Sequence, residues 1–226
     1  MHILINGAGI AGLTLAYWLN KFGFIVSVVD KRPDLQDAGY MIDFYGPGFD
    51  VAEKMSVLDQ LLTWHYPIKD ISFIDRYGKT RSSIDIEKFR RLLHFRHFNF
   101  MRGDLAIVLF EMVKDTAPIQ FDTSVSQIQQ RSDGVHVAFT DGTKKDCDLV
   151  VGADGIHSKI RQLVWSDKKQ FEHFLGYYVA CSIVEDRFGV QKSVYSHIEP
   201  GSHAAVYPSQ PSNGNPFRLQ VRTIEY

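Results

Sequence analysis

The sequence predicts an α/β protein, with a parallel sheet at the N-terminus and antiparallel strands both inserted into this sheet domain and appended to it. Three observations lead to this prediction. The first 30 residues alternate strand, glycine turn, helix and strand. Residues 68–85 and 123–151 contain strand patterns paired around turns. From residue 173 onward the pattern is entirely β, whereas a simple doubly wound sheet would continue to alternate strands and helices.

The first 30 residues have the pattern of a βαβ unit. A short apolar run, residues 3–5, is typical of a buried parallel strand. Residues 10–22 place apolar side chains at helical spacing without a proline. A β-branched run over residues 25–29 then ends in an acidic residue, Asp30. Strand, turn, helix and strand together have the size expected of a βαβ unit.

The turn GAGIAG inside this unit predicts a site for a dinucleotide. Gly7 permits the tight turn, Gly9 lets the backbone approach a pyrophosphate, and Gly12 lets helix and strand pack closely. The first amides of the helix would face the diphosphate. Asp30 stands where a carboxylate can accept hydrogen bonds from an adenosine ribose. The alternative is an ordinary turn whose glycines serve packing alone, and dehydrogenases, flavoproteins and nucleotide-sugar enzymes can all begin this way.

The remaining elements follow from local patterns. Asp141-Gly142 lies between two strand patterns and predicts a hairpin. Helices are predicted at about residues 49–62, in 101–115 after a strand end, and after residue 155. Strands are predicted at residues 40–44, 68–76, 79–85, 123–130, 134–140, 143–151, 176–185, 191–198, 203–208 and 216–224.

Composition predicts an ordinary soluble globular protein. The 226 residues are 45% hydrophobic and 23% charged with a net charge of −1, which disfavours nucleic acid or an anionic membrane as a partner. Cys147 and Cys181 lack the spacing of a disulfide framework or zinc site and suit a reducing, cytoplasmic location. We expect no secretory signal and no membrane-spanning segment.

A second motif narrows the class of nucleotide site. The stretch DLVVGADGIHSKIR, residues 148–161, resembles the aspartate-glycine motif of flavin-dependent aromatic hydroxylases, the para-hydroxybenzoate hydroxylase-like class A monooxygenases. The resemblance implies that Asp154 and Gly155 lie beside the FAD pyrophosphate and contribute to binding of the reduced nicotinamide. Ser158 and Arg161 match the usual continuation of this motif. Amides at residues 155–158 would then face a phosphate, and the alternative is a purely structural strand-to-helix turn.

Other segments extend the resemblance. Asp30 matches the acid that contacts the adenosine ribose in this family, and Lys31 and Arg32 match the basic positions that often follow it. In FMRGDL, residues 100–105, Arg102 matches an arginine that reaches the ribityl and phosphate region of the flavin. The loop GYMID, residues 39–43, resembles a segment that passes near the flavin.

The resemblance implies a Rossmann-like FAD-binding domain of the glutathione reductase type with an inserted and appended antiparallel β substrate domain. Residues 1–67 and 98–172 would form the FAD-binding domain, and residues 68–97 and 173–226 the β-rich substrate domain. The implied activity is hydroxylation of a small aromatic or polycyclic substrate with FAD, NAD(P)H and O₂. No catalytic acid, base or nucleophile is identified, and neither the choice of nicotinamide nor the oligomeric state is predicted.

The family's third motif, a glycine-aspartate before an alanine-rich helix, has no match, so we expect a C-terminally truncated chain. A catalytically silent remnant that binds a nucleotide or a partner is therefore an alternative, as is a flavin reductase or halogenase.

Three weaker patterns remain in the sequence. His94 and His97 are spaced for one helix but lack a third metal ligand, and the basic, aromatic run 89–100 is interpreted as a solvated, partly packed face. The aromatic residues of the tail could line a pocket or pack in a core; they are Tyr177, Tyr178, Tyr195, Tyr207 and Phe217.

Overall fold

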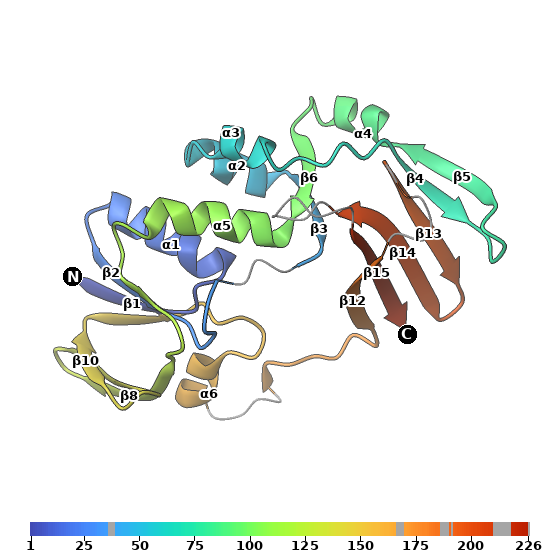
Figure 1. Ribbon diagram of the computed structural model, residues 1–226. Helices are drawn as coiled ribbons and strands as arrows, with labels where there is room; N and C mark the ends of the chain where they lie inside the picture. The colour runs from blue at the N-terminus through green and yellow to red at the C-terminus, as the bar shows by residue number, and fades with distance from the viewer. Residues whose placement is uncertain (36–38, 166–169, 186–189, 191, 210–217, 226) are drawn as a thin grey trace. The chain divides into compact units, whose positions relative to one another are not determined.

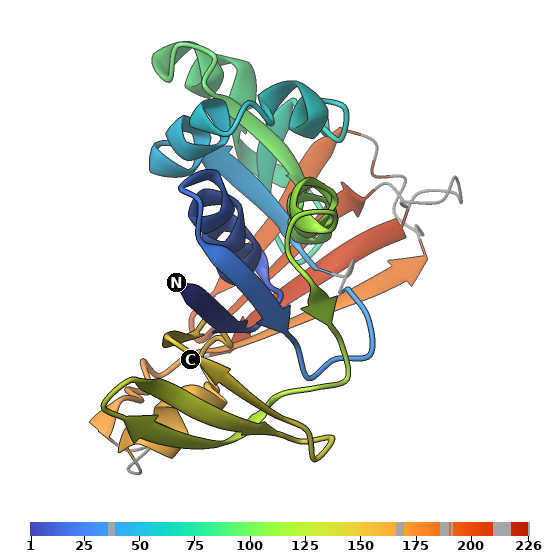
Figure 2. The same cartoon turned by 90° about the vertical axis from the view of Figure 1, so that its left-hand side faces the viewer.

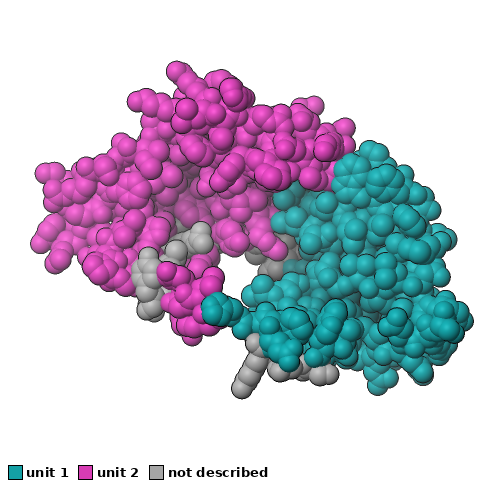
Figure 3. Space-filling model, turned by 180° about the vertical axis from the view of Figure 1, so that it is seen from behind, with its two compact units in different colours: residues 1–37, 105–173 teal, residues 38–104, 174–226 magenta. Residues whose placement is uncertain are grey.

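The chain divides into two compact units. A computed structural model describes residues 1–35, 39–165, 170–185, 190, 192–209 and 218–225. Unit 1 comprises residues 1–37 and 105–173, and unit 2 comprises residues 38–104 and 174–226 (Figure 3). The sequence placed residues 38–67 and 98–104 in the FAD-binding domain, whereas the compact units place both segments in unit 2. The functional assignment of the two domains stays a prediction.

Unit 1 is built on a parallel sheet with the strand order β11-β1-β2-β7 (Figure 1). Its strands are β1 (His2–Asn6), β2 (Ile25–Val29), β7 (Ile119–Gln120) and β11 (Leu149–Gly152). Helix α1 (Ile10–Lys21) connects β1 to β2, which confirms the predicted βαβ unit. Most of β1 and β2 is buried, as expected of apolar strands covered on both faces.

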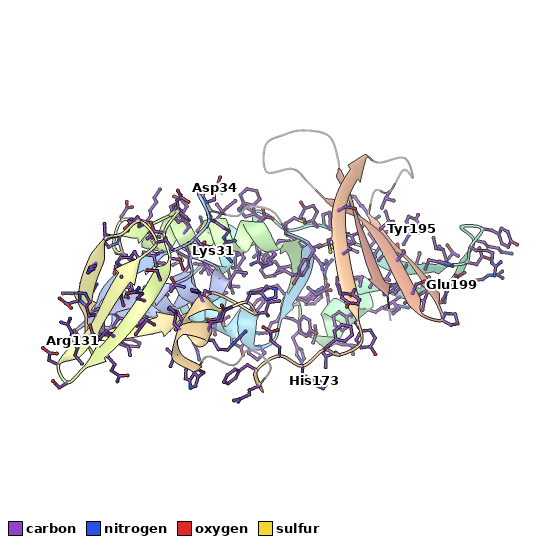
Figure 4. The ribbon with its side chains drawn as sticks, turned by 90° about the horizontal axis from the view of Figure 1, so that it is seen from below. Lys31, Asp34, Arg131, His173, Tyr195 and Glu199 are labelled. Carbon is purple, nitrogen blue, oxygen red and sulfur yellow. The ribbon has the colours of Figure 1, made fainter. Side chains whose placement is uncertain are left out.

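A second, antiparallel sheet of unit 1 covers one face of the parallel sheet. It consists of β8 (Val125–Arg131), β9 (Gly134–Phe139) and β10 (Lys144–Cys147). Helices α1 and α5 (Arg102–Val113) lie on the opposite face (Figure 2). The buried cluster on the side of the antiparallel sheet contains Leu4, Val29, Val125, Val137, Phe139, Cys147 and Ile160. Arg131 lies at the turn between β8 and β9 (Figure 4).

The prediction of one strand over residues 143–151 is wrong. The chain leaves β10, which is antiparallel to β9, and enters β11, which is parallel to β1. The change of sheet occurs at Asp148, whose N–H donates to the carbonyl of His2 at 2.9 Å. Among the described strands β11 is the edge of its sheet, and Leu149 is 44% exposed.

Unit 2 holds a two-stranded antiparallel ribbon and a six-stranded sheet. The ribbon pairs β3 (Met41–Tyr45) with β6 (His97–Met101). The larger sheet has the order β12-β15-β14-β13-β4-β5, in which only the β4–β13 pair is parallel. Its strands are β4 (Asp70–Ile74), β5 (Thr80–Asp85), β12 (Tyr178–Glu185), β13 (Ser193–Glu199), β14 (Ser202–Ser209) and β15 (Arg218–Glu225).

The predicted helix over residues 49–62 is two helices. Helix α2 (Pro47–Lys54) ends before Ser56, which has a φ of 59°, and α3 (Leu58–Leu62) follows. The N–H of Val57 donates to the carbonyl of Ala52, and that of Ser56 to the carbonyl of Glu53. This is the Schellman pattern, with serine at the left-handed position where glycine is usual. Helix α2 therefore ends without the glycine by which the end of a helix is usually recognised in a sequence.

The same kind of helix ending separates His94 from His97. Helix α4 (Ile86–Leu92) is capped at its start by the Asp85 carboxylate and ends with His94 at a φ of 50°. His94 lies in the turn and His97 lies on β6, so the prediction that both residues lie on one helix is wrong. The N–H of Phe95 donates to the carbonyl of Arg90, which closes the helix.

Strand β6 is buried along its whole length, so the packed part of the solvated, partly packed face predicted for residues 89–100 is its C-terminal part, while residues 91, 92, 94 and 95 are exposed. The ring of Phe44 lies 5.5 Å from that of Phe98 and 5.1 Å from that of Phe100, between centroids.

The aromatic residues of the tail differ in their exposure. Tyr207 is buried, Tyr177 and Tyr178 are exposed, and Tyr195 lies on β13 with Glu199 at its end (Figure 4). Phe217 lies outside the described residues.

Candidate functional site

The glycine turn lies at the carboxyl end of β1, and each of its three glycines has a different steric environment. Gly7 has a φ of +121°, and a Cβ atom there would lie 2.4 Å from the carbonyl oxygen of Ala153. A Cβ on Gly12 would lie 1.9 Å from the carbonyl oxygen of Gly7. These two positions exclude a side chain because backbone already fills the space.

Gly9 differs from its neighbours because a Cβ there would meet no atom within 4 Å. Its φ of −83° and ψ of −176° are also open to residues with a side chain. It is the N-cap of α1, and no side chain caps the helix there. Backbone geometry and protein packing therefore do not explain a glycine at this position. An open cradle at a helix N-terminus fits a phosphate group that must approach the backbone closely.

Asp30, at the end of β2, is buried beside this turn. Its Oδ2 accepts a hydrogen bond from the N–H of Ala8 at 2.7 Å. Its Oδ1 accepts from the N–H of Arg32 at 2.9 Å, and the guanidinium of Arg32 donates to both oxygens at 3.0 Å. Burial raises the pKa of Asp30, but the hydrogen bonds from Arg32 and Ala8 outweigh it and hold the pKa below its usual range. The carboxylate is therefore ionised and fixed against the glycine turn.

The two basic residues after Asp30 have different surroundings. Arg32 pairs with Asp30, whereas Lys31 is exposed in the segment that follows β2, near Asp34 (Figure 4). The charge of Lys31 is therefore accessible to an anionic group. The guanidinium of Arg32 is already hydrogen-bonded to Asp30, the carboxylate that was predicted to bind a ribose.

The aspartate-glycine motif forms the loop between β11 and α6 (Lys159–Trp165). Asp154 Oδ2 accepts hydrogen bonds from the N–H groups of Lys159 at 2.6 Å and of Ile160 at 3.2 Å. Ser158 donates to Asp154 Oδ1 at 2.6 Å and accepts from the N–H of Arg161. The amides of residues 159–161, the first of α6, are thus capped by the motif's own side chains. That the amides of residues 155–158 face a phosphate stays a prediction. Asp154 fixes the loop that lies against Gly7.

Gly155 has a φ of +80°, and a Cβ there would meet no atom within 4 Å. The positive φ alone explains glycine at this position. Within unit 1 the structure therefore gathers the glycine turn, Asp30 and the 153–155 loop at the carboxyl ends of β1, β2 and β11, where parallel α/β sheets bind ligands.

Asn6 holds this arrangement together, and the sequence analysis missed it. Its side chain is buried at the end of β1 and donates to Asp154 Oδ2 at 3.0 Å. Its Oδ1 accepts from the N–H of Val125 at 3.0 Å and from the hydroxyl of Ser124 at 3.2 Å. A polar residue that closes an apolar strand is the one signal that could have pointed to it.

Arg102 and Gly39 belong to unit 2 and lie next to each other there. A Cβ on Gly39 would lie 3.0 Å from the Cβ of Arg102, and the N–H of Arg102 donates to the carbonyl of Tyr40. Arg102 is the first residue of α5 and is half-buried. Its predicted reach toward a flavin stays a prediction.

No helix among the residues that the structure describes is both long and apolar enough to cross a membrane. Within the same residues, no group of three or more His, Cys, Asp or Glu side chains is placed to hold a metal ion.

The chain matches the family described as "FAD binding domain" over residues 1–210. It is 33% identical over 202 residues to a flavin-dependent monooxygenase of Legionella longbeachae, covering 88% of this chain and 49% of that protein. It is 31% identical over 230 residues to the FAD-dependent monooxygenase asL4 of Sarocladium schorii, covering 98% of this chain and 52% of that protein. The crystal structure of tetracycline destructase Tet(51) has a TM-score of 0.82 at 27% identity, over 99% of this chain and 56% of that one.

The fold and the matches define an FAD-binding domain of the flavin-dependent monooxygenase class, which is the class that residues 148–161 resemble. The chain belongs to the FAD-binding domain family of flavin-dependent monooxygenases, which confirms the predicted family and fold class. It spans about half the length of the curated relatives it matches.

Proposed function

We propose that the chain forms the FAD-binding part of a flavin-dependent monooxygenase that hydroxylates a small organic substrate with NAD(P)H and O₂. The observation that supports this most directly is Gly9, a glycine that neither its backbone angles nor its neighbours require. Beside it stands a buried, ionised carboxylate, Asp30, which supplies the acceptor that an adenosine ribose needs.

In this proposal the glycine turn binds the adenosine diphosphate part of FAD. Gly7 and Gly12 shape the turn, and Gly9 admits the pyrophosphate to the first amides of α1. Asp30 accepts a hydrogen bond from the ribose, for which the guanidinium of Arg32 must give up part of its contact. Lys31 contributes positive charge from the surface.

Three further residues complete the proposed cofactor site. Asp154 positions the 153–155 loop against the turn, and Gly155 supplies the backbone conformation that this loop needs. Arg102 would contact the ribityl and phosphate region. The chemistry that FAD supplies when bound is acceptance of a hydride from NAD(P)H and activation of O₂, while the protein binds, orients and excludes water.

The substrate class is proposed from similarity. The relative of known structure with a TM-score of 0.82 is a tetracycline destructase, which favours an aromatic or polycyclic substrate for this chain too. A catalytically silent nucleotide-binding chain is the competing function, and it differs in one observable: it does not transfer electrons from NAD(P)H to a flavin.

The test is a visible absorption spectrum of the purified chain. We would add FAD, remove the unbound flavin by gel filtration, and then add NADPH or NADH without oxygen. A retained yellow band that bleaches with a reduced nicotinamide supports the proposal. A folded chain that stays colourless at saturating FAD refutes the cofactor proposal, and a bound flavin that neither nicotinamide bleaches favours the silent alternative.

A further inference from the structure

The β4–β5 hairpin forms one edge of the six-stranded sheet of unit 2 (Figure 1). Every residue of β5 is exposed. In the described part of the chain, the hairpin pairs with the rest of the sheet through the parallel β4–β13 ladder, whose register runs from Ser193 opposite Asp70 to Ser196 opposite Phe73. A ladder this short at the edge of a sheet is a place where local opening requires the loss of few contacts.

Different side chains hold the two ends of this ladder. At its start, the hydroxyl of Ser193 donates to Oδ2 of Asp70 at 2.9 Å. At its other end, Nδ1 of His197 lies 2.9 Å from the carbonyl oxygen of Ile74, one residue beyond the last registered pair. The pairing of β4 with β5 is also irregular there, with a shift between Phe73 and Ile74. A histidine side chain therefore takes the place of strand pairing at this end.

Both ring nitrogens of His197 face an acceptor. Nδ1 lies against the carbonyl of Ile74, and Nε2 lies 3.2 Å from Oε1 of Glu199. A neutral imidazole has one N–H and can donate to only one of these oxygens, whereas the imidazolium donates to both. The hydrogen bond to the Ile74 carbonyl, opposed by desolvation and supported by Glu199, raises the pKa of His197 above its ordinary value. The closed arrangement is therefore that of the charged ring.

The other charged groups near the ring come from the turn after β4, from β5 and from β14. The titratable or charged side chains that line the same hollow as the ring, besides Glu199, are Asp75, Arg76, Tyr77 and Arg81. Asp75 also attracts the charged ring, but its carboxylate accepts from the guanidinium of Arg81 at 2.9 Å. On β14, His203 lies on the other face of the sheet, where its Nε2 is 2.8 Å from a serine hydroxyl. Glu199 is thus the carboxylate bonded to the ring.

A hollow of about 420 Å³ lies beside the ring, where β4 and β13 diverge. Two of the large side chains that line it are mostly solvated, because Tyr77 is 85% exposed and Ile198 is 56% exposed. Side chains this exposed contribute little packing to the end of the hairpin. The hydrogen bonds of His197 are therefore a large part of what holds it to β13.

We propose that His197 is a pH-dependent switch: as an imidazolium it holds the tip of the β4–β5 hairpin, residues 74–80, to β13, and loss of its proton frees the tip. The folded-state pKa lies above the unfolded value of about 6.5, so the attachment is complete below about pH 6.5 and is lost as the pH rises through the folded-state pKa. Ionisation of Glu199 sets the lower limit, at about pH 4.3. The inference does not rest on the proposed function, because it involves only contacts within unit 2.

Hydrogen–deuterium exchange with mass spectrometry on the full chain measures the release. Exchange of peptides covering residues 70–82 would be compared at about pH 5.5 and about pH 9, on either side of the ordinary histidine pKa. Each rate is divided by the intrinsic rate of an unstructured chain at the same pH. We expect the corrected exchange to be about two- to fivefold faster at the higher pH, the range that corresponds to an exposed ion pair. Peptides covering β2 in unit 1 serve as the internal reference.

Two substitutions fix the switch in opposite states. His197→Gln keeps a neutral donor, so the corrected exchange should be fast at both pH values and match that of the wild type at the higher one. His197→Arg keeps the charge at both pH values and has donors for both acceptors, so the exchange should stay slow. His136→Gln is the matched control, because His136 also pairs with a carboxylate, that of Asp146 at 2.7 Å, but lies in unit 1. It should leave the pH response of the hairpin unchanged.

Three outcomes would overturn the inference. The first is a corrected exchange of the wild-type hairpin that is the same at both pH values. The second is a pH response that persists in His197→Gln, which would assign it to another titrating group. The third is a titration midpoint of His197 at or below about 6.5, followed by NMR of the imidazole nitrogens and assigned with the same variant. The first and third use the wild-type chain alone, so they decide the matter even where a variant fails to fold.

Discussion

The substitution Gly9→Ala separates the cofactor role of the glycine turn from its structural role. A Cβ at this position meets no protein atom within 4 Å, and the φ of −83° suits alanine. If the open space is reserved for a pyrophosphate, the added methyl group should block the ligand and leave the apoprotein intact. The structure thus predicts a folded variant that binds FAD poorly.

The effect on stability should be close to zero. Replacing glycine by alanine at a compatible position stabilises a protein by about 0.4–1 kcal/mol, because the unfolded chain has less freedom to lose. Alanine is a poorer N-cap than glycine, which costs about 0.5–1 kcal/mol at the start of α1. These contributions cancel to within about 0.5 kcal/mol, or about 2 °C in melting temperature for a chain of this size.

The effect on FAD affinity should be large. A diphosphate displaced from the first amides of α1 loses one charge-assisted hydrogen bond, worth about 1.5–3 kcal/mol. At 1.36 kcal/mol per tenfold change, the dissociation constant rises by about 10- to 150-fold. Fluorescence titration with FAD measures this constant, and thermal unfolding without FAD measures stability.

Gly23→Ala is the control, because Gly23 has a φ of +82° and open space around it in the loop after α1. Alanine there should cost about 1–2 kcal/mol in stability and leave FAD affinity unchanged. Unaltered FAD binding by folded Gly9→Ala would refute the cradle. A fall of its apoprotein melting temperature by more than about 5 °C would refute the steric argument.

Three further predictions concern the same site. Gly12→Ala should lower the free energy of unfolding by about 3 kcal/mol or more, as measured by urea denaturation, because its Cβ would overlap the carbonyl of Gly7; unchanged stability would contradict the close approach. Asn6→Ala should cost about 2–4 kcal/mol in the same assay, since it leaves the buried N–H of Val125 without its acceptor and removes one of the donors to the carboxylate of Asp154; a cost below about 0.5 kcal/mol would show that Asn6 does not connect these segments. The folded-state pKa of Asp30 lies below its ordinary value of about 3.9, so its contribution to stability is complete above about pH 4 and is lost as the pH falls through the lower value. Asp30→Asn should therefore flatten this acid limb of a stability–pH profile, and an identical limb in both proteins would contradict the pairing with Arg32.

Strand register explains why sequence patterns found the cofactor turn but missed the hydrogen bond between Asp43 on β3 and His97 on β6. The turn and its flanking strands lie within one short segment, so their periodicity and glycines are visible together. Asp43 and His97 are 54 residues apart and meet only because β3 pairs with β6 in one register. A shift of that register by one residue would turn His97 to the other face of the ribbon.

The helix boundaries show a second limit of sequence patterns. Both α2 and α4 end in a left-handed residue that is not glycine, at Ser56 and His94. The expected signal for such an ending is glycine or asparagine. The two helices therefore could not be delimited from residue types, and His94 could not be separated from the strand that holds His97.

The sequence by itself determined the α/β class, the βαβ unit with its glycine turn, and the membership of a flavin-binding family. These depend on side-chain period and on glycines, which are local properties of the chain. Only the tertiary structure decided which glycine has room for a ligand, that Arg32 shares the carboxylate of Asp30, and that Asp154 caps its own helix. Steric space and hydrogen-bond partners depend on segments that are distant in sequence and become neighbours only when the sheets form.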